Sequence, residues 1–398
     1  MAPLFTGLRL GFGRSAEVAG GSPSFMTFSV PSPVESGKVT AGGYTWYTFT
    51  SSGAFTVTTV AGPQAGTDGV PGNYISVMMV GGGASGGNHH GAGGGAGGVV
   101  YATDPNGYGV IDSLPGGNNN SIPIVIGAGG FSVGGHNATT PGVPGKSTKF
   151  GSGPESYHLI AYGGGGGGSH AQPNYNGQSQ DYSPMSTWTI NETGPPSIAP
   201  VTNAWWNPNV PGGSNNGGGG PRSGGCGGGE SWNSPGSAPN PGPWPANYGS
   251  DAPGSGTAGP GFANQPIAPS NSATYGYGFA GGGCTTSESG GGGGTLEAGN
   301  TDGQMYGGDA RSTPSNFWAG NPGNHPVYPS PYSFGAGGAG MNNGGGAGTA
   351  GSANPGGGGA GNGGNATGYG NGGAGNRPFS GSSGTGSGGI MIIKVKTS

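Results

Sequence analysis

The sequence predicts an all-β protein, in which a β-sandwich core is joined to glycine-rich segments of polyglycine II type and to long irregular loops, with almost no helix. Three observations lead to this class. Of the 398 residues, 105 are glycine and 36 are proline, far above the roughly 12 per cent that the two reach together in average proteins. Apolar residues occur in short alternating runs, the pattern of half-buried strands. No segment keeps the 3.6-residue period of a helix over a useful length.

The glycine is expected to be ordered. The chain has 10 basic and 14 acidic residues, a net charge of −4, and so lacks the high charge that keeps disordered chains open. Glycine runs such as residues 163–168 and 290–294 do not follow the strict three-residue register of collagen. Without a Cβ atom, extended segments can instead lie side by side and pair their backbone N–H and C=O groups.

The same small number of cations excludes nucleic-acid binding through a basic patch. No stretch approaches the roughly 20 apolar residues of a membrane span. Residues 1–20 contain Arg9 and Arg14 but no apolar run of a secretory signal. We therefore expect a soluble chain that is made in the cytoplasm, with no membrane insertion.

Four stretches divide the chain. Residues 1–25 form a short N-terminal peptide with the apolar-basic pattern LFTGLRLGFGRS. Residues 26–168 form the sandwich core. Residues 169–335 form an insertion rich in Pro, Asn and aromatic residues, which we interpret as display loops between core strands. Residues 336–398 are a glycine-rich return that ends in a last core strand.

Within the core, alternation over residues 44–49 and 55–59, with a short turn at residues 51–54, predicts a hairpin. Further strands are predicted over residues 74–80, 99–101, 122–126 and 159–162. The apolar run at residues 390–395 must return to the core sheet, because an isolated strand would leave an exposed edge.

Motifs for catalysis or phosphate binding are weak. Ser85 lies in a formal G-x-S-x-G, but the nucleophile elbow needs a helix after the turn, and no helix is predicted there. Gly145-Lys146-Ser147 resembles the end of a phosphate-binding loop. Thr140 occupies the place of its first glycine, however, and the prolines at 141 and 144 remove amide donors.

No metal site or cofactor is predicted. His89 and His90 are adjacent, so on a strand they would point to opposite faces, and no carboxylate or cysteine follows at ligand spacing. The 14 acidic residues are scattered along the chain, although a pair could still meet in space. We therefore expect no enzymatic activity.

Cys226 and Cys284 both lie beside glycines. They could form a disulfide in an oxidising setting, or remain two small buried thiols.

The aromatic residues of the insertion are candidates for recognition. Trp and Tyr offer rigid flat faces at low entropy cost, and surrounding Asn and Ser add adaptable hydrogen bonds. The candidate receptor-binding residues are Trp205, Trp206, Trp232, Trp244, Trp318, Tyr328 and Tyr332. The alternative is that they pack over glycine layers that have no side chains of their own to bury.

Several core pieces together resemble the glycine-rich domain that recurs in virion and tail proteins of tailed bacteriophages and in some bacterial surface proteins. The pieces are YTWYTFTSSGAFTV (44–57), ISVMMVGGGASGG (75–87), GGGAGGVVY (93–101), IPIVIGAGG (122–130), GKSTKFGS (145–152), LIAYGGGGGG (159–168) and GSGGIMIIKV (386–395). They cover the core and its return strand, and residues 169–335 have no counterpart. The chain is also similar, more loosely, to the tip adhesins of T-even-type phages, in which packed polyglycine helices carry receptor-binding loops.

This resemblance implies a non-enzymatic virion structural protein, a tail fibre or adhesin that is assembled in the host cytoplasm and recognises a glycan or protein of the host surface. The N-terminal peptide resembles pieces that dock on other virion proteins, and the residues implied are Leu4, Phe5, Leu8, Arg9, Leu10, Phe12 and Arg14. A homo-oligomer, by analogy a trimer, is expected.

Other classes stay open. A capsid decoration or head fibre protein would have the same fold and docking peptide. A bacterial cell-surface glycine-rich structural protein would normally require a secretion signal. A glycine-rich antifreeze protein should show regular tripeptide repeats, which are absent. A depolymerase would need paired carboxylates, with Asp181, Glu192, Glu230 and Asp251 as candidates.

Overall fold

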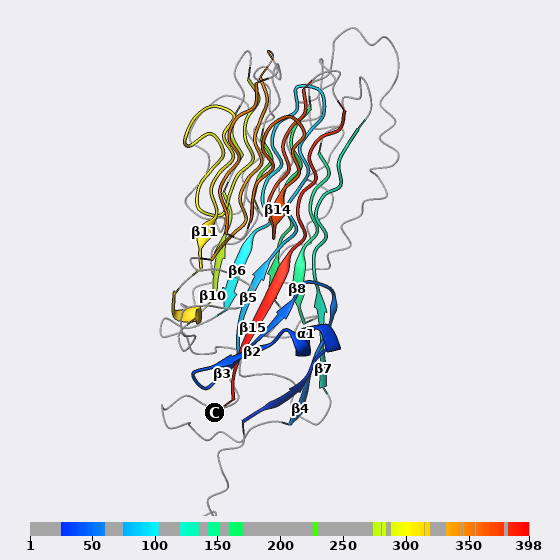
Figure 1. Cartoon of the computed structure of the whole chain (residues 1–398), viewed down its shortest axis with the longest axis vertical. Coiled ribbons are helices and arrows are strands. Elements are labelled where there is room, and N and C mark those ends of the chain that lie inside the picture. Colours follow the sequence, from blue (N-terminus) through cyan, green and yellow to red (C-terminus); the bar gives the residue numbers. More distant parts are fainter. Residues whose placement is uncertain are drawn as a thin grey trace, which may run out of the picture.

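The computed structural model has two regions that share many of their chain segments: two β-sheets at one end and a bundle of extended glycine-rich segments at the other (Figure 1). We call the bundle the glycine lattice. The structure describes residues 25–59, 75–102, 120–134, 142–151, 159–169, 226–229, 274–279, 281–283, 288–313, 315–318, 332–342, 344, 346–354, 356–377 and 381–397.

The first sheet has six antiparallel strands in the order β10-β6-β5-β15-β3-β2. Their bounds are β2 Val39–Ala41, β3 Tyr44–Phe49, β5 Ile75–Val80, β6 Val99–Ala102, β10 Thr274–Tyr277 and β15 Ile390–Lys396. The last strand of the chain thus lies in the middle of the sheet, between β5 and β3. This confirms that the C-terminal run returns to the core. The edge strand β10 comes from the stretch that was predicted to be display loops.

The second sheet has five antiparallel strands in the order β1-β4-β7-β8-β9. They are β1 Thr27–Ser29, β4 Gly53–Thr59, β7 Asn120–Val125, β8 Thr148–Phe150 and β9 Leu159–Ala161. Two small pairs complete the strands: β11 Arg311–Ser312 with β12 Ser333–Phe334, and β13 Gly356–Gly357 with β14 Thr367–Gly368.

Helix is nearly absent from the described ranges, which contain α1 Ser32–Ser36 and the 3₁₀ turn η2 Ser315–Trp318. Pro31 is the N-cap of α1 and Pro33 lies in its first turn, where the missing N–H of proline is tolerated, and Val34 of this helix is buried. Neither helix has the length to cross a bilayer. The all-β class predicted from the sequence is confirmed.

Side chains from both sheets form one apolar cluster. In β15 the odd-numbered residues Met391, Ile393 and Val395 enter this cluster with Phe55 of β4 and Ile122 of β7. The even-numbered residues point to the other face of the six-stranded sheet, because successive side chains of a strand alternate. There Ile390 and Ile392 join a second cluster. Every residue of β15 is therefore buried.

The hairpin predicted over residues 44–59 is wrong. β3 and β4 belong to different sheets, since β3 pairs with β2 and β15 while β4 pairs with β1 and β7. Phe49 and Phe55 lie on either side of the crossing and enter the same cluster. The apolar alternation of the two segments is satisfied by burial against a shared core and did not require them to pair with each other.

Six strands continue directly into the glycine lattice. Residues 81–87 follow β5, residues 126–133 follow β7, and residues 162–169 follow β9. In the opposite direction, residues 91–98 lead into β6, residues 142–147 into β8, and residues 381–389 into β15.

Backbone hydrogen bonds in the lattice repeat every three residues. In residues 81–87, the amides of Gly81, Ala84 and Gly87 donate to residues 92–98 at 2.9–3.0 Å. The amides of the next positions, Gly82 and Ser85, donate to residues 143–146. The amides of the third positions, Gly83 and Gly86, donate to residues 384–387. Three residues per turn is the repeat of polyproline II-type helices, in which successive amides point in three directions.

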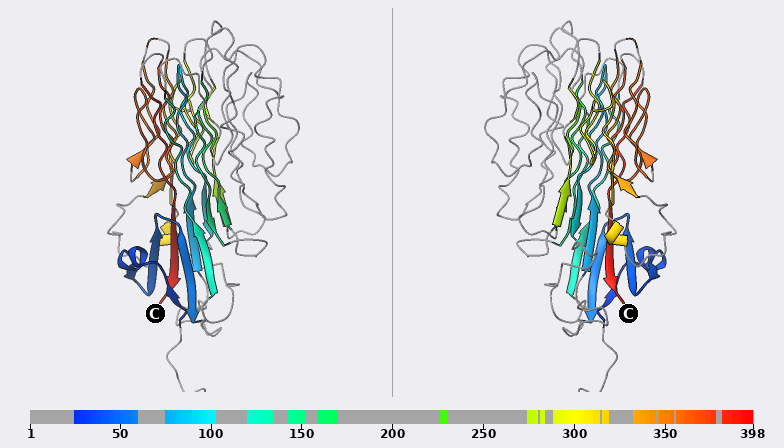
Figure 2. Two further views of the ribbon diagram at one scale, coloured as in Figure 1. Left: turned by 90° about the vertical axis from the view of Figure 1, so that its right-hand side faces the viewer. Right: turned by 90° about the vertical axis from the view of Figure 1, so that its left-hand side faces the viewer.

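Carbonyls of the same segment accept bonds from three further neighbours: residues 164–167, residue 130 and residues 373–376. Residues 81–87 are therefore surrounded by six segments, and the side views show segments from distant parts of the sequence lying side by side (Figure 2). This packing needs glycine. A Cβ atom on Gly83 would lie 2.0 Å from the carbonyl oxygen of Asn371.

Candidate functional site

The described turns at the far end of the lattice are closed by asparagine side chains. Asn300 Oδ1 accepts bonds from the amides of Gly291, at 2.9 Å, and Met305, at 3.1 Å. Asn362 Oδ1 accepts the amide of Arg377 at 2.9 Å. The turn at Asn362 lies away from the sheets. The neighbouring segment bonds there through the Asn376 amide to the carbonyl of Gly87, which is the end of residues 81–87 that is far from β5. These side chains satisfy backbone groups where the lattice bonding stops.

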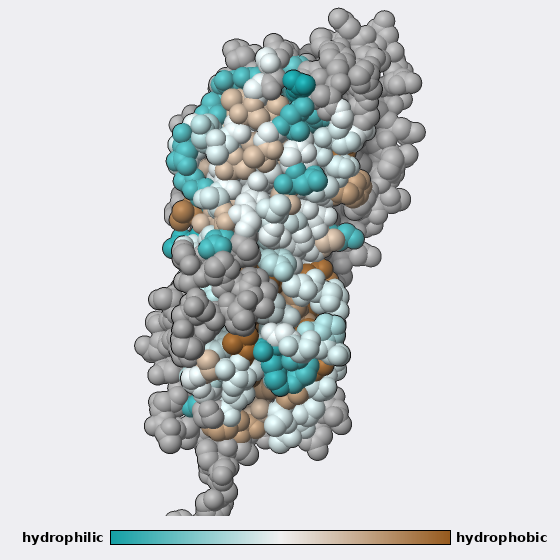
Figure 3. Space-filling model, viewed as in Figure 1, coloured by the Kyte–Doolittle hydropathy of each residue, from teal (hydrophilic) through white to brown (hydrophobic). Residues whose placement is uncertain are grey.

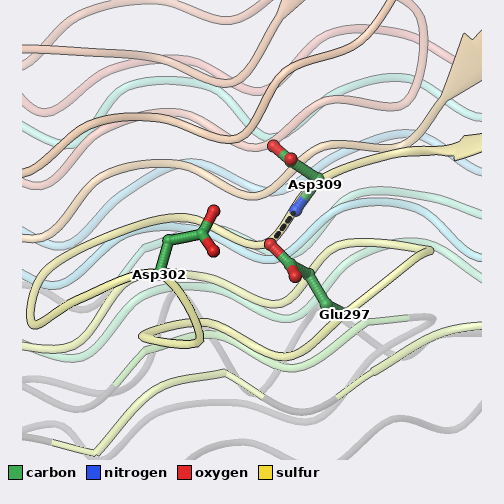
Figure 4. A group of neighbouring side chains, drawn as sticks. All are labelled: Glu297, Asp302 and Asp309. Atoms are coloured by element: carbon green, nitrogen blue, oxygen red, sulfur yellow. Dashed lines mark hydrogen bonds between the residues drawn. The ribbon is translucent and has the colours of Figure 1, made fainter.

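A group of three carboxylates lies beside the turn at Asn300. Glu297, Asp302 and Asp309 each offer an oxygen within 4.8 Å of the others (Figure 4). Burial raises the pKa of Glu297, and the nearby Asp302 and Asp309 carboxylates add to this, whereas the Asp309 amide, which donates to Glu297 Oε1 at 3.2 Å, lowers it.

Three carboxylates are ligands of the kind that hard cations such as Ca²⁺ prefer. Asp309 already has a structural role, however, because its Oδ1 accepts bonds from the Ser352 amide at 2.7 Å and hydroxyl at 2.9 Å. This group was not predicted from the sequence, since a lattice turn brings together residues that show no ligand spacing along the chain. The Asn300-x-Asp302-Gly303 turn was the available signal.

His89 and His90 lie in a turn and not on a strand as expected. Both have φ of 54°, and they connect residues 81–87 to residues 91–98. Both side chains are buried, and their rings meet edge to face with centroids 5.1 Å apart.

The two weak sequence motifs are parts of the lattice. Ser85 is fully buried, and its Oγ accepts the amide of Val143 at 2.8 Å. The Gly145 and Lys146 amides donate to the carbonyls of Gly164 and Ala128, so they do not point into a shared phosphate cradle.

Two of the candidate receptor-binding aromatics are described, and both are buried. Trp318 is 9% exposed and Tyr332 is 5% exposed. Their ring centroids are 4.5 Å apart, and Trp318 also meets Phe317 at 5.1 Å. Together they cover the outer face of the six-stranded sheet, where Trp46 donates to the Phe317 carbonyl at 3.5 Å. Both rings are thus packed, but against apolar side chains of the sheet and not over glycine layers as the packing alternative expected.

The other candidate residues lie outside the described residues. They are the aromatics Trp205, Trp206, Trp232, Trp244 and Tyr328 and the docking residues Leu4, Phe5, Leu8, Arg9, Leu10, Phe12 and Arg14. The candidate depolymerase carboxylates Asp181, Glu192, Glu230 and Asp251 also lie there.

Cys226 is a fully buried thiol in the lattice and is free of disulfide partners within the part of the chain that the structure describes. Its Sγ donates to the Gly294 carbonyl at 3.1 Å, and burial raises its pKa to about 12. Cys284 lies outside the described residues, so a disulfide between the two stays a prediction.

The face of the molecule seen in Figure 3 shows no single large patch of one kind among the described residues. In the view of Figure 3 the lattice is mostly pale, with small separate polar and apolar areas. Comparison with protein-family models and with curated protein sequences found no match.

Proposed function

We propose that this chain is a non-enzymatic structural protein of a phage virion, a tail fibre or adhesin that displays receptor-binding loops on a glycine-rich scaffold. One observation carries the proposal: the two ends of the molecule differ, with the sheets at one end and the lattice turns at the other. The C-terminal end of the described chain lies at the sheet end, and Phe25 lies there too, with its ring 5.9 Å from Lys396 Nζ (Figure 1). Lattice turns lie at the opposite end.

Such an arrangement suits attachment at one end and display at the other. The lattice supports its turns with backbone hydrogen bonds in several directions, so loops anchored on it would lose little entropy on binding. Under this proposal the N-terminal peptide docks on other virion proteins, a homotrimer is expected, and a host glycan or protein is the ligand. The tryptophans at 205, 206 and 244 are the first candidates for contact.

The alternatives keep the same architecture. A capsid decoration or head fibre protein would use the docking end without binding a host, and a bacterial surface protein would project the lattice from a cell.

Electron microscopy of particles from the source of the chain, labelled with an antibody against residues 169–335, separates these functions. Label at the tail supports the proposal, label over the head supports decoration, and absence of label from every particle would reject a virion protein. After tail labelling, Trp205→Ala and Trp244→Ala should reduce adsorption to host cells. Val125→Ala, at a side chain that is 43% exposed on β7, is the matched control and should leave adsorption unchanged.

A further inference from the structure

The strands at the sheet end differ in how firmly their neighbours hold them. β5 runs toward the lattice, so its antiparallel partner β15 runs away from it and ends at the sheet end. β15 pairs over residues 390–395 with β5 on one side and over residues 391–396 with β3 on the other. We call these three strands the central clamp.

The chain between Phe25 and Gly43 is held differently. It contains β1, α1 and β2, and both strands have three residues and lie at sheet edges. Among the described strands β1 pairs with β4 alone, with an irregularity next to Thr27, and β2 pairs with β3 alone. We call residues 25–43 the N-terminal section. Its buried side chains include Met26 and Val34, and its half-buried Phe28 packs against the same apolar cluster.

Strand directions determine how a pull along the molecule would act. Hydrogen bonds of an antiparallel pair are perpendicular to the strands, so a pull along a strand loads all of its bonds together. β15, pulled from the C-terminus, would load two ladders in this way. β1, pulled from Phe25, would load one ladder of three residue pairs.

β2 is the weakest point under the same pull. It runs antiparallel to β3, so Val39 lies at its lattice side and Ala41 at its sheet-end side. Force that arrives through Lys38 would draw Val39 back toward the sheet end and open the pairs one at a time. Beyond Gly43 the force reaches Tyr44 of β3, which is paired along its length with β15.

We propose that the N-terminal section is a releasable length of chain in series with the central clamp. A pull between the N-terminus and the lattice tip first frees residues 25–43, and the clamp then bears the load. A pull between the C-terminus and the tip acts on the clamp directly. This inference rests on the proposed function, because an appendage that docks at one end and binds at the other is pulled along this axis.

Single-molecule pulling on the full-length chain tests it. One handle is attached near the lattice tip through Thr301→Cys, an exposed turn position. Cys284→Ser removes a cysteine to which the handle could also attach, and Cys226 is protected from attachment by its burial. The second handle is placed at Ser24→Cys or at Ser398→Cys. With the handle at position 24 we expect an early step at low force that adds on the order of 60 Å, at about 3.3–3.6 Å per freed residue. A second rupture at higher force follows. With the handle at position 398 only the higher-force rupture is expected.

Phe28→Ala is the matched variant. Its ring packs against Phe55, with centroids 4.5 Å apart, and against Tyr47 at 6.3 Å. Its loss should lower the force of the early step and leave the rupture from position 398 unchanged. A single rupture at equal force from both attachment points, or an early step from position 398, would overturn the proposal. The pulling measurement needs neither a host cell nor a virus particle. Its failure would therefore reject the releasable section, whereas failure of particle labelling would reject the proposed function.

Discussion

Val80 and Ile390 lie opposite each other at the boundary between the six-stranded sheet and the glycine lattice. Val80 is the last residue of β5 before Gly81, and Ile390 is the first residue of β15 after Gly389. On the sheet side, alternating side chains fill two apolar clusters. On the lattice side, the amide of Gly81 donates to Gly98 and that of Gly389 donates to Gly127. The same segments thus change from side-chain packing to backbone packing within one residue.

The first prediction concerns this backbone packing. Gly83→Ala should destabilise the fold by about 1–3 kcal/mol or more, as overpacking does, because the new Cβ would lie 2.0 Å from the Asn371 carbonyl oxygen. Gly388→Ala is the control, since the nearest atom to its Cβ would be 3.8 Å away, and a change of no more than about 0.5 kcal/mol is expected there. Thermal unfolding of the two variants checks this. Equal stability of both would contradict the close packing of residues 81–87.

Much of the sheet region could be predicted from the sequence. Apolar alternation located β5, β6, β7, β9 and β15 to within about two residues, and the need to cover a lone strand returned β15 to the core. The partners of the strands could not be predicted, because alternation specifies a buried face and not a neighbour. This is why β3 and β4 were expected to form a hairpin.

The sequence predicted the type of packing in the lattice but not which segments are neighbours. Its composition favoured polyglycine II-type packing, yet glycine offers no side-chain pattern to say that Gly94 accepts from Gly338 or that Gly93 donates to Gly290. The carboxylate group at Glu297 was hidden for the same reason. Burial of Trp318 and Tyr332 depends on the outer face of the six-stranded sheet, which exists only after β15 has been inserted.

A second prediction concerns Tyr101, whose hydroxyl is fully buried and has no hydrogen-bond partner among the described residues. Tyr101→Phe should stabilise the protein by about 1 kcal/mol or more, because an unsatisfied buried polar group costs about 1–3 kcal/mol. Thr148→Val removes a hydroxyl that donates to Val80 and accepts the Gly127 amide, so it should destabilise the protein. Chemical denaturation measures the change in the free energy of unfolding of each variant. A loss of stability in Tyr101→Phe would contradict the prediction.

A third prediction concerns pH. Burial raises the pKa of Glu297 above its unfolded value of 4.5, so the folded state holds this proton more tightly than the unfolded state. The associated stability is fully present below about pH 4.5 and is lost as pH rises through the folded pKa. Glu297→Gln keeps an acceptor for the Asp309 amide and removes the ionisation. The variant should gain stability over the natural chain at pH 7, and the gain should shrink toward pH 4. A difference that is the same at both pH values would contradict the assigned cause.

The last prediction concerns the thiol of Cys226. Its pKa, raised by burial from 9.0 to about 12, lowers the thiolate fraction at pH 8 by roughly a thousandfold, and the thiolate is the form that alkylating reagents attack. Iodoacetamide should therefore leave Cys226 unmodified in the folded protein, as read by peptide mass spectrometry, and modify it after denaturation. Denaturation without a reductant also tests the pairing with Cys284. Full alkylation of both residues under those conditions shows two thiols, whereas alkylation that requires prior reduction shows a disulfide and contradicts the free state of Cys226.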